Sequence, residues 1–469
     1  MRTIMPTLRA SGSTGIVHIR SVIVGLILCV AAIPAGRATD APVAQAITLD
    51  DPELSYAVDM LSVAQEAARQ ASAARWPSVT LRGEWRPRPA VGGVIGNGSS
   101  GRTSLSLNLT IPVIDEASRH NRAAAALMAR VGIARVEAAT QEALLRRGIG
   151  VLAVERDREL LRLAGQDELA LASLVDMARM RFEAGLAAVG DVYEAVSANA
   201  VASRARIDAQ LRLDDSLVAL RLMGGASAPA LPSIASSWRV GQRFRAESEE
   251  DVVQRALRHP RVEAAQHDLA ASERRLAAAR VTYLPKLHLQ ASYGVSSRRE
   301  ALAWIASAGS RAHRRSRATV MLVLKLPLHG ASSSAALVRR GIADRDVKID
   351  ALNDLRRDAV RDTRRLYRRT QTDRMLLAAT RSAVAAAEAA VDTVSVGLAA
   401  GTHSWPQRLR GESRLAASRI EHCRARYAAI ENELSLLQLV GELTVDSLLR
   451  PGSKDPDACG VSRADTRQP

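Results

Sequence analysis

The sequence predicts a mainly α-helical fold that carries four short amphipathic strands, and three observations support this prediction. Aromatic residues make up only 3% of the chain. A composition that replaces them with Ala, Leu and Arg is typical of long helices packed side by side. From Asp115 to Glu183 the chain runs without a proline, which predicts one very long helix. The order helix, strand, loop, strand, long helix and last helix occurs twice.

The N-terminal region has the order of a secretory signal peptide. Basic residues up to Arg20 precede the apolar run from Ser21 to Ile33, and small residues follow. The run is short for a transmembrane helix. We therefore expect a leader of residues 1–38 that includes Cys29, with Ala46 as a second cleavage position. The remaining two cysteines do not suggest a disulfide framework.

The first element of the repeat is an Ala-rich helix followed by a proline and a strand. One copy opens at Asp51-Pro52, and the other opens 208 positions later at His259-Pro260. Proline is tolerated in the first turn of a helix. Pro77 and Pro285, which are also 208 positions apart, precede two tracts that alternate polar and apolar residues. Strict alternation predicts a strand with one apolar face.

A second strand closes each pair, and we expect it to end at a proline. Ser104 to Ile111 alternates polar and apolar residues before Pro112, and the mostly apolar tract Val320 to Leu326 stands before Pro327. The second of these strands contains Lys325. Tracts of this length are about sufficient for tilted strands that cross a bilayer, which need roughly nine to eleven residues. A soluble sheet with one buried face would show the same alternation as a membrane barrel.

Four strands are too few to close a barrel around a water-filled lumen. An open sheet edge is also not tolerated in lipid, because its backbone groups would lack partners. If these strands cross a membrane, several chains must pool them, and three chains would supply twelve. Trp85 and Tyr293 occupy the same position in the two copies, and we expect both at the membrane interface.

Each copy continues with a long helix, a late glycine and a last helix. The glycines are Gly185 and Gly401, 216 positions apart, and glycine adopts the left-handed conformation after a helix end at little cost. A helix as long as the first would span roughly 100 Å and needs helical neighbours of similar length. We expect a signal peptide at 1–38, repeats at 39–225 and 247–445, an irregular linker at 226–246, and a disordered tail at 446–469.

The signal peptide, the duplicated unit, the strand start Leu284-Pro285-Lys286-Leu287 and the glycine-terminated last helices resemble the outer membrane efflux protein (TolC) family. The resemblance covers roughly residues 47 to 445. It implies a homotrimer with a long α-helical barrel in the periplasm and a twelve-stranded β-barrel in the outer membrane. It implies a passive channel for efflux or type I secretion, set in outer-membrane lipid, with a periplasmic adaptor (membrane fusion protein) and an inner-membrane transporter as partners. The alternative is a periplasmic coiled-coil scaffold or adaptor without a membrane barrel.

The resemblance also places a pore constriction on the helix after the late glycine, where acidic residues of the second repeat ring the entrance. The first repeat has Asp191 and Glu194 there, but the second has Gln407 and Arg410. This substitution predicts a neutral or cationic constriction that favours anions. Alternatively, the second helix starts elsewhere, because Pro406 interrupts the pattern. The carboxylates of Asp191 and Glu194 also suit a first helical turn, where the helix dipole stabilises them.

The formal net charge of +16 allows two interpretations. One is a polyanionic partner, and the other is charge spread over solvated helix faces. Because acidic residues are interleaved and no nucleic-acid motif is present, we expect no nucleic-acid partner. The pairs Arg364-Arg365 and Arg368-Arg369 are either solvated, or bound to a neighbouring helix, or a docking surface for an acidic adaptor. No His or Cys set has metal-ligand spacing and no catalytic motif occurs, so we expect no metal, no cofactor and no enzymatic activity.

Overall fold

The computed structural model describes residues 51–87, 101–224, 238, 240, 243–297, 315–327 and 331–445. The chain forms two compact units, residues 1–44 and 45–469, and every described residue belongs to the second. The expected signal peptide and the expected tail at 446–469 lie outside the described residues.

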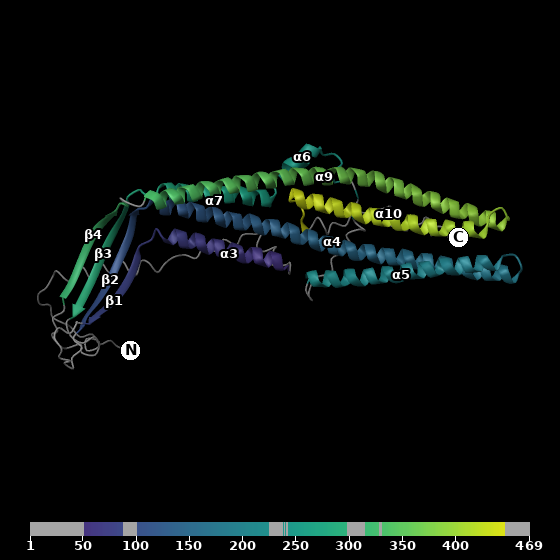
Figure 1. The fold of residues 1–469 in the computed structure, drawn as a ribbon, viewed down its shortest axis with the longest axis horizontal. Coiled ribbons are helices and arrows are strands. Elements are labelled where there is room, and N and C mark those ends of the chain that lie inside the picture. The colour runs from purple at the N-terminus through teal and green to yellow at the C-terminus, as the bar shows by residue number, and fades with distance from the viewer. Residues whose placement is uncertain are drawn as a thin grey trace, which may run out of the picture. The chain divides into compact units, whose positions relative to one another are not determined.

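The helices follow the predicted duplication. The first repeat contains α3 (Pro52–Ala73), α4 (Glu116–Glu183) and α5 (Val189–Gly224), and the second contains α7 (Pro260–Arg280), α9 (Ala331–Ala399) and α10 (Trp405–Val440) (Figure 1). The short α6 (Glu249–Ala256) lies between them in the sequence. The predicted uninterrupted helix is confirmed, since α4 has 68 residues and α9 has 69.

The short helix of each repeat begins with the same kind of cap. Asp51 accepts hydrogen bonds from the backbone N–H of Glu53 at 3.0 Å and of Leu54 at 3.3 Å. His259 Nδ1 accepts one from the N–H of Arg261 at 3.1 Å. These acceptors satisfy N–H groups that a helix start leaves without intrahelical partners.

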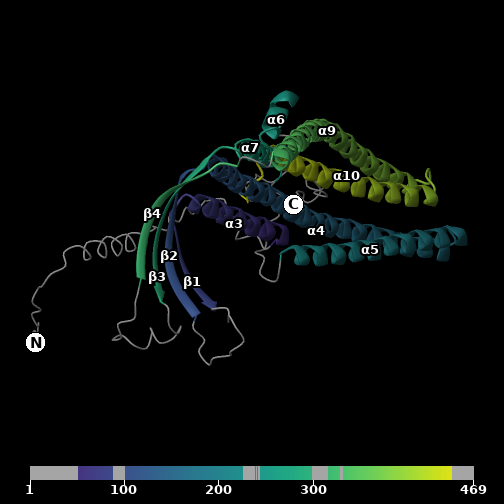
Figure 2. The same cartoon turned by 60° about the vertical axis from the view of Figure 1, so that its left-hand side comes forward.

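The strands form one antiparallel sheet in the order β1 (Ser78–Pro87), β2 (Gly101–Ile114), β3 (Lys286–Ser297) and β4 (Arg315–Lys325) (Figure 2). The two repeats meet where β2 pairs with β3. In the described part of the chain, β1 and β4 each have a neighbour on one side only. Both outer edges of the sheet are therefore open within one chain.

The register places the apolar residues of β1, β2 and β3 on one face, and β4 adds Val320, Leu322 and Leu324 to this face. Paired residues in an antiparallel sheet share a face. One cross-strand row contains Val79, Leu109, Ala291 and Val320, and the next contains Leu81, Leu107, Tyr293 and Ala318. This face is not covered by any described part of the chain: Leu81 is 67% exposed and Val320 72% exposed. A continuous apolar face without cover is what lipid requires of a membrane strand.

The expected end of the second strand at Pro112 is wrong. Strand β2 continues to Ile114, and its register with β3 shifts between Pro112 and Ile114. The first residue of β1, Ser78, pairs with Thr110, so β2 has no β1 partner at Pro112. Because proline lacks an N–H, it fits a strand only at such an irregular, one-sided position. Pro77, Pro285 and Pro327 do flank their strands as predicted.

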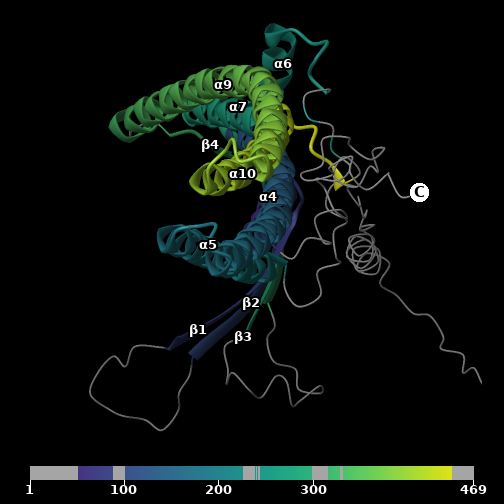
Figure 3. The same cartoon turned by 90° about the vertical axis from the view of Figure 1, so that its right-hand side faces the viewer.

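The helices pack in a row that matches the strand order. Helices α3 and α5 both contact α4, α4 contacts α7 and α10, and these two contact α9. The view along the long helices shows α9, α10, α4 and α5 in this order (Figure 3). Close packing depends on glycine at one contact: a Cβ at Gly132 would lie 2.9 Å from Leu61 Cδ1 and 3.2 Å from Leu61 Cα.

The main core joins both repeats and part of the expected linker. It includes Leu152 and Leu160 of α4, Ile430 and Leu434 of α10, and other buried residues. The expected linker at 226–246 also contributes to this core, because Trp238 and Phe244 are buried in it. Gln141 of α4 donates to Leu443 O at 2.9 Å and accepts from Leu443 N at 3.0 Å. The end of the second repeat is thus fastened to the long helix of the first.

One arginine of each pair on α9 binds a neighbouring helix. Arg364 and Arg368 form ion pairs with Glu249 of α6, and Arg364 also reaches Glu250. Among the described helices, one span of α9, Ser334–Ala399, is long and apolar enough by composition to cross a membrane, with 17% of its apolar window buried. Length and composition alone do not separate such a span from the packed surface of an Ala-rich helix.

Candidate functional site

The two turns that join the long helices to the last helices have the same geometry. Gly185 and Gly401 have φ angles of 71° and 76°, which only glycine adopts easily. Leu186 N donates to Arg181 O and Thr402 N donates to Gly397 O, both at 2.8 Å. Both turns lie at the end of the long helices that is farthest from the strands (Figure 1). The duplication therefore extends to the hydrogen bonds of the turns.

Asp191 and Gln407 occupy equivalent positions after these turns, and both cap a helix. Asp191 Oδ2 accepts a hydrogen bond from Ala188 N at 3.3 Å. Gln407 Oε1 accepts one from Ser404 N at 2.8 Å, in a capping box. Pro406 lies in the first turn of α10, which begins 216 positions after α5. The structure thus gives no sign of the displaced helix start that Pro406 suggested, because proline fits a first turn.

Glu194 and Arg410 are the other equivalent pair, and they carry opposite charges. Both side chains are exposed. Arg410 Nε donates to Pro406 O at 3.1 Å, which holds the guanidinium along the first turn of α10. Within the described residues, no hydrogen bond or ion pair joins the acidic pair of α5 to Gln407 or Arg410. The two repeats therefore have turns of the same geometry, but the helix after the first turn carries carboxylates and the helix after the second carries a cation.

A buried apolar cluster holds the ends of the four long helices together. Trp405 and Leu409 of α10 pack against Leu174 and Val175 of α4 and against Ala195 of α5, and all five are buried. Trp405 directly precedes Pro406, so its burial fixes the start of α10 against the other repeat. The sequence indicates this apolar face, because Trp405 and Leu409 are four positions apart and therefore lie on one side of the helix.

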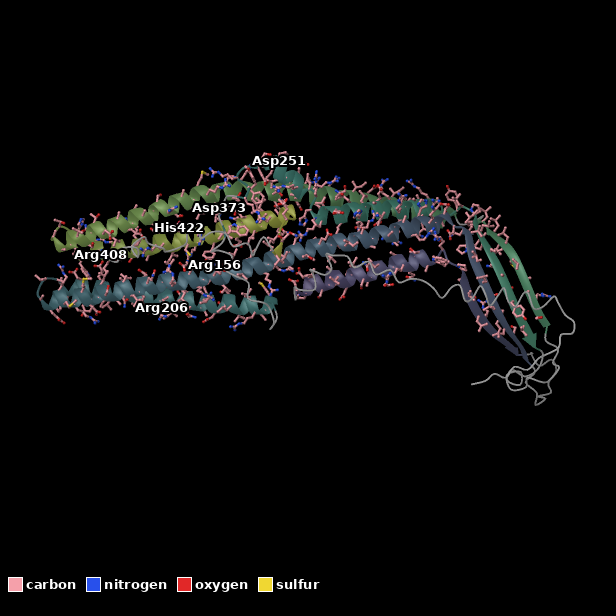
Figure 4. The ribbon with its side chains drawn as sticks, turned by 180° about the vertical axis from the view of Figure 1, so that it is seen from behind. Arg156, Arg206, Asp251, Asp373, Arg408 and His422 are labelled. Carbon is pink, nitrogen blue, oxygen red and sulfur yellow. The ribbon has the colours of Figure 1, made fainter. Side chains whose placement is uncertain are left out.

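Two carboxylates meet between the repeats, and sequence reasoning missed them. Asp167 of α4 and Glu412 of α10 line a small cavity of about 40 Å³ together with Leu415 and Arg419. Burial and the nearby Glu412 carboxylate raise the pKa of Asp167 to about 6. Glu412 is bound by Arg408 Nη2 at 2.5 Å, and Figure 4 marks Arg408 near the turn end of α10. No sequence pattern joins residues of different repeats, so the pair was not predictable.

The histidines and the two aromatic residues singled out in the strands are placed as follows. No group of three or more His, Cys, Asp or Glu side chains there is placed to hold a metal ion. His422 of α10, also marked in Figure 4, lies 2.9 Å from Thr380 Oγ1. Tyr293 lies in mid-strand on the apolar face and is 45% exposed. The side chain of Trp85 is outside the described part, so the interfacial role of the two aromatics stays a prediction.

Known structures share this architecture over most of their length. The outer membrane protein VceC of Vibrio cholerae matches with a TM-score of 0.72 and 18% identity, over 85% of this chain and 95% of its own. The MtrE outer membrane channel of Neisseria gonorrhoeae matches with 0.72 and 16%, over 87% and 89%. The CmeC outer membrane channel of Campylobacter jejuni matches with 0.70 and 12%, over 94% of each chain. The comparison with curated proteins finds no match.

The duplicated helices with their four-stranded sheet define a class of channel proteins that combine an α-helical barrel with a β-barrel part. The chain belongs to the outer membrane efflux protein family, whose pattern matches residues 43–226 and 252–442. It is an outer-membrane channel of efflux systems with a helical tunnel in the periplasm. The membership confirms the resemblance seen in the sequence and removes the alternative of a scaffold without a membrane barrel. The family transports and has no known enzymatic role.

Proposed function

We propose that three copies of this chain close one channel by joining the open edges of their sheets. The single observation that carries this proposal is the four-strand sheet with an uncovered apolar face and two unpaired edge strands, β1 and β4. Lipid does not tolerate unpaired edges. Pairing β4 of one copy with β1 of the next satisfies both edges, and three copies give twelve strands around a water-filled interior.

The helices support the same closure. Helix α9 stands at one end of the helix row and α3 with α5 at the other, and in the described part no extensive contact joins these ends. Exposed apolar side chains remain at both ends, for example Val347 of α9 and Val201 of α5. A ring of three copies would pair these two ends with each other, below the strands that β1 and β4 contribute.

We further propose that the channel conducts passively and works with a periplasmic adaptor and an inner-membrane transporter, in efflux or in type I secretion. In this proposal the inner-membrane transporter supplies the energy for transport. The turns around Gly185 and Gly401 form the end of the tunnel that faces the inner membrane. They are the parts of the chain that an adaptor reaches first.

The charge at these turns bears on selectivity. We propose that Gln407 and Arg410 make the constriction neutral or cationic, where an acidic pair would favour cations. Both lie at the start of α10, and Arg410 is exposed. A fixed positive charge raises the barrier to cations and lowers it for anions.

Planar-bilayer recording of the purified protein tests this function. The expected result is uniform conductance steps without any nucleotide or ion gradient beyond the applied voltage. In the native host, deletion of the gene is expected to raise the cell-associated level of a fluorescent efflux substrate, and the intact gene to restore it. A bilayer that stays silent at all voltages, together with unchanged accumulation in the deletion strain, would refute the proposal.

A further inference from the structure

The polar face of the sheet is strongly basic. The sequence of the four strands contains one acidic residue, Glu84, against seven lysine and arginine residues. The register puts four of these basic residues on the polar face: Arg82, Lys286, Arg317 and Lys325. In a membrane barrel the apolar face meets lipid and the polar face meets the lumen. The interior of the strand barrel therefore has a surplus of positive charge in every copy.

One cross-strand row concentrates this charge. Arg82 of β1 pairs with Ser106, Ser106 with Gly294, and Gly294 with Arg317 of β4. Small residues occupy the two central positions, so they do not cover either guanidinium. Both arginines are exposed, and neither has an ion-pair partner among the described residues. Lys286, by contrast, is neutralised by Asp115 at 3.1 Å.

Closure of the trimer brings the two arginines of this row onto neighbouring strands. Arg82 is on β1 and Arg317 on β4, the two edges that the proposed function joins between copies. Three junctions then carry six arginines around the lumen. Like charges on adjacent strands repel one another, and this repulsion is relieved by a bound or passing anion.

We infer that Arg82 and Arg317 make the strand barrel an anion-attracting exit, and that the cargo class it favours is small anions. The inference rests on the proposed trimeric channel and deepens it. A unit charge about 10 Å away in water changes the local concentration of a monovalent ion by a factor of about two. The effect is largest at low salt, where the Debye length of about 30 Å at 0.01 M exceeds this distance.

The barrel arginines lie far from the constriction at the turns, so a blocker added to one side of the bilayer distinguishes the two sites. Helix α9, with 69 residues, spans roughly 100 Å between the strands and the turns at about 1.5 Å per residue. Pyrophosphate added in about 10 mM KCl on the side of the strand barrel is expected to block single-channel current at lower concentration than on the side of the helical turns. The reversal potential in a KCl gradient is expected to show preference for chloride.

The double variant Arg82→Gln and Arg317→Gln is expected to weaken the strand-side block at least about fourfold, from a factor of about two for each of the two charges lost per copy. Arg82→Lys with Arg317→Lys should keep the block, because charge and not shape attracts the anion. Arg364→Gln is the matched control, since Arg364 pairs with Glu249 and Glu250 of α6 away from the sheet.

Each outcome decides a different claim. Conductance steps with an unchanged block in the double glutamine variant, or cation preference in the natural protein, would overturn the inference while leaving the channel intact. Absence of any conductance from the natural protein would overturn both. If the double glutamine variant does not assemble, the single Arg317→Gln variant and the lysine variant carry the same comparison.

Discussion

Gln407 caps α10 in the way that Asp191 caps α5, at positions 216 apart in the two repeats. Both side chains accept a hydrogen bond from a backbone N–H that the helix start would otherwise leave without a partner. A residue that resembles a lost member of a charged ring is therefore also a structural cap. Any test of its role in the constriction has to keep the cap in place.

Gln407→Glu meets this requirement. Glutamate keeps the acceptor oxygen of a capping box and places a negative charge at the helix start, where the dipole favours it. We expect unchanged or slightly higher thermal stability and a shift of ion selectivity towards cations. Gln407→Ala should instead cost about 0.5–1 kcal/mol of stability through loss of the cap. Unchanged selectivity in Gln407→Glu would contradict a role of this position in the constriction.

Gly132→Ala should destabilise the packing of α3 on α4. Its new methyl group would lie 2.9 Å from Leu61 Cδ1 and 3.2 Å from Leu61 Cα, and the backbone atom has little freedom to move. We expect a loss of about 1–3 kcal/mol, as for other overpacked contacts. Gly165→Ala is the control on the same helix, because nothing lies within 4 Å of its Cβ. Thermal unfolding followed by circular dichroism compares the two, and equal stability would show that α3 adjusts freely.

Asp167→Asn should change how stability depends on pH. The pKa of Asp167 is raised to about 6 from 3.8 by burial and by Glu412. The folded state thus holds a proton that the unfolded state has lost between these values, and stability falls as pH rises through this window. In the variant the free energy of unfolding should no longer fall across this pH window. At pH 8 it should exceed that of the natural protein by on the order of 1 kcal/mol, a value smaller than the full pKa shift implies because solvent screens the partly exposed carboxylate.

Unfolding midpoints at pH 5 and pH 8 measure this effect. Asp176→Asn is the control, because Asp176 lies on the same helix with its side chain 74% exposed. The account of Asp167 fails if both variants follow the pH dependence of the natural protein.

Arg146→Met should loosen the start of α3. Arg146 Nη2 lies 2.9 Å from Asp51, and its Nη1 lies 2.6 Å from Glu53. Partial burial favours the neutral carboxyl, but the hydrogen bonds from Arg146 and from Leu54 N lower the pKa of Asp51 below its ordinary value. We expect a loss of about 1–3 kcal/mol at pH 7.

Because the pKa of Asp51 is lower in the folded state than in the unfolded state, the ionised carboxylate stabilises the fold at a pH above the unfolded-state pKa. This stabilisation is lost as the pH falls through the folded-state pKa. The difference between Arg146→Met and the natural protein should therefore shrink below about pH 4, near the ordinary Asp pKa. Arg179→Met, whose weak ion pair at 4.0 Å is exposed, is the control. A difference that grows in acid would contradict this account.

The sequence predicted the repeat, the long helices and the apolar strand faces, because each depends on a local period or on proline and glycine. The end of β2 was predicted wrongly at Pro112. A proline fits inside this strand because β1 does not pair with β2 at that position, and the sequence does not show where the pairing ends. The burial of Trp238 in the core and the meeting of Asp167 with Glu412 were also missed. Each joins segments far apart in the chain, and one sequence holds no signal for such contacts.

The central claim, that three chains pool their strands in the outer membrane, is tested most directly by the mass of the detergent-extracted protein. The account predicts extraction by detergent and not by salt, and a band of about three chain masses on denaturing gels that falls to a single chain after boiling. Crosslinking through cysteines placed on β1 and β4 should join different copies. Release by salt alone, with a single-chain band at every temperature, would contradict the claim.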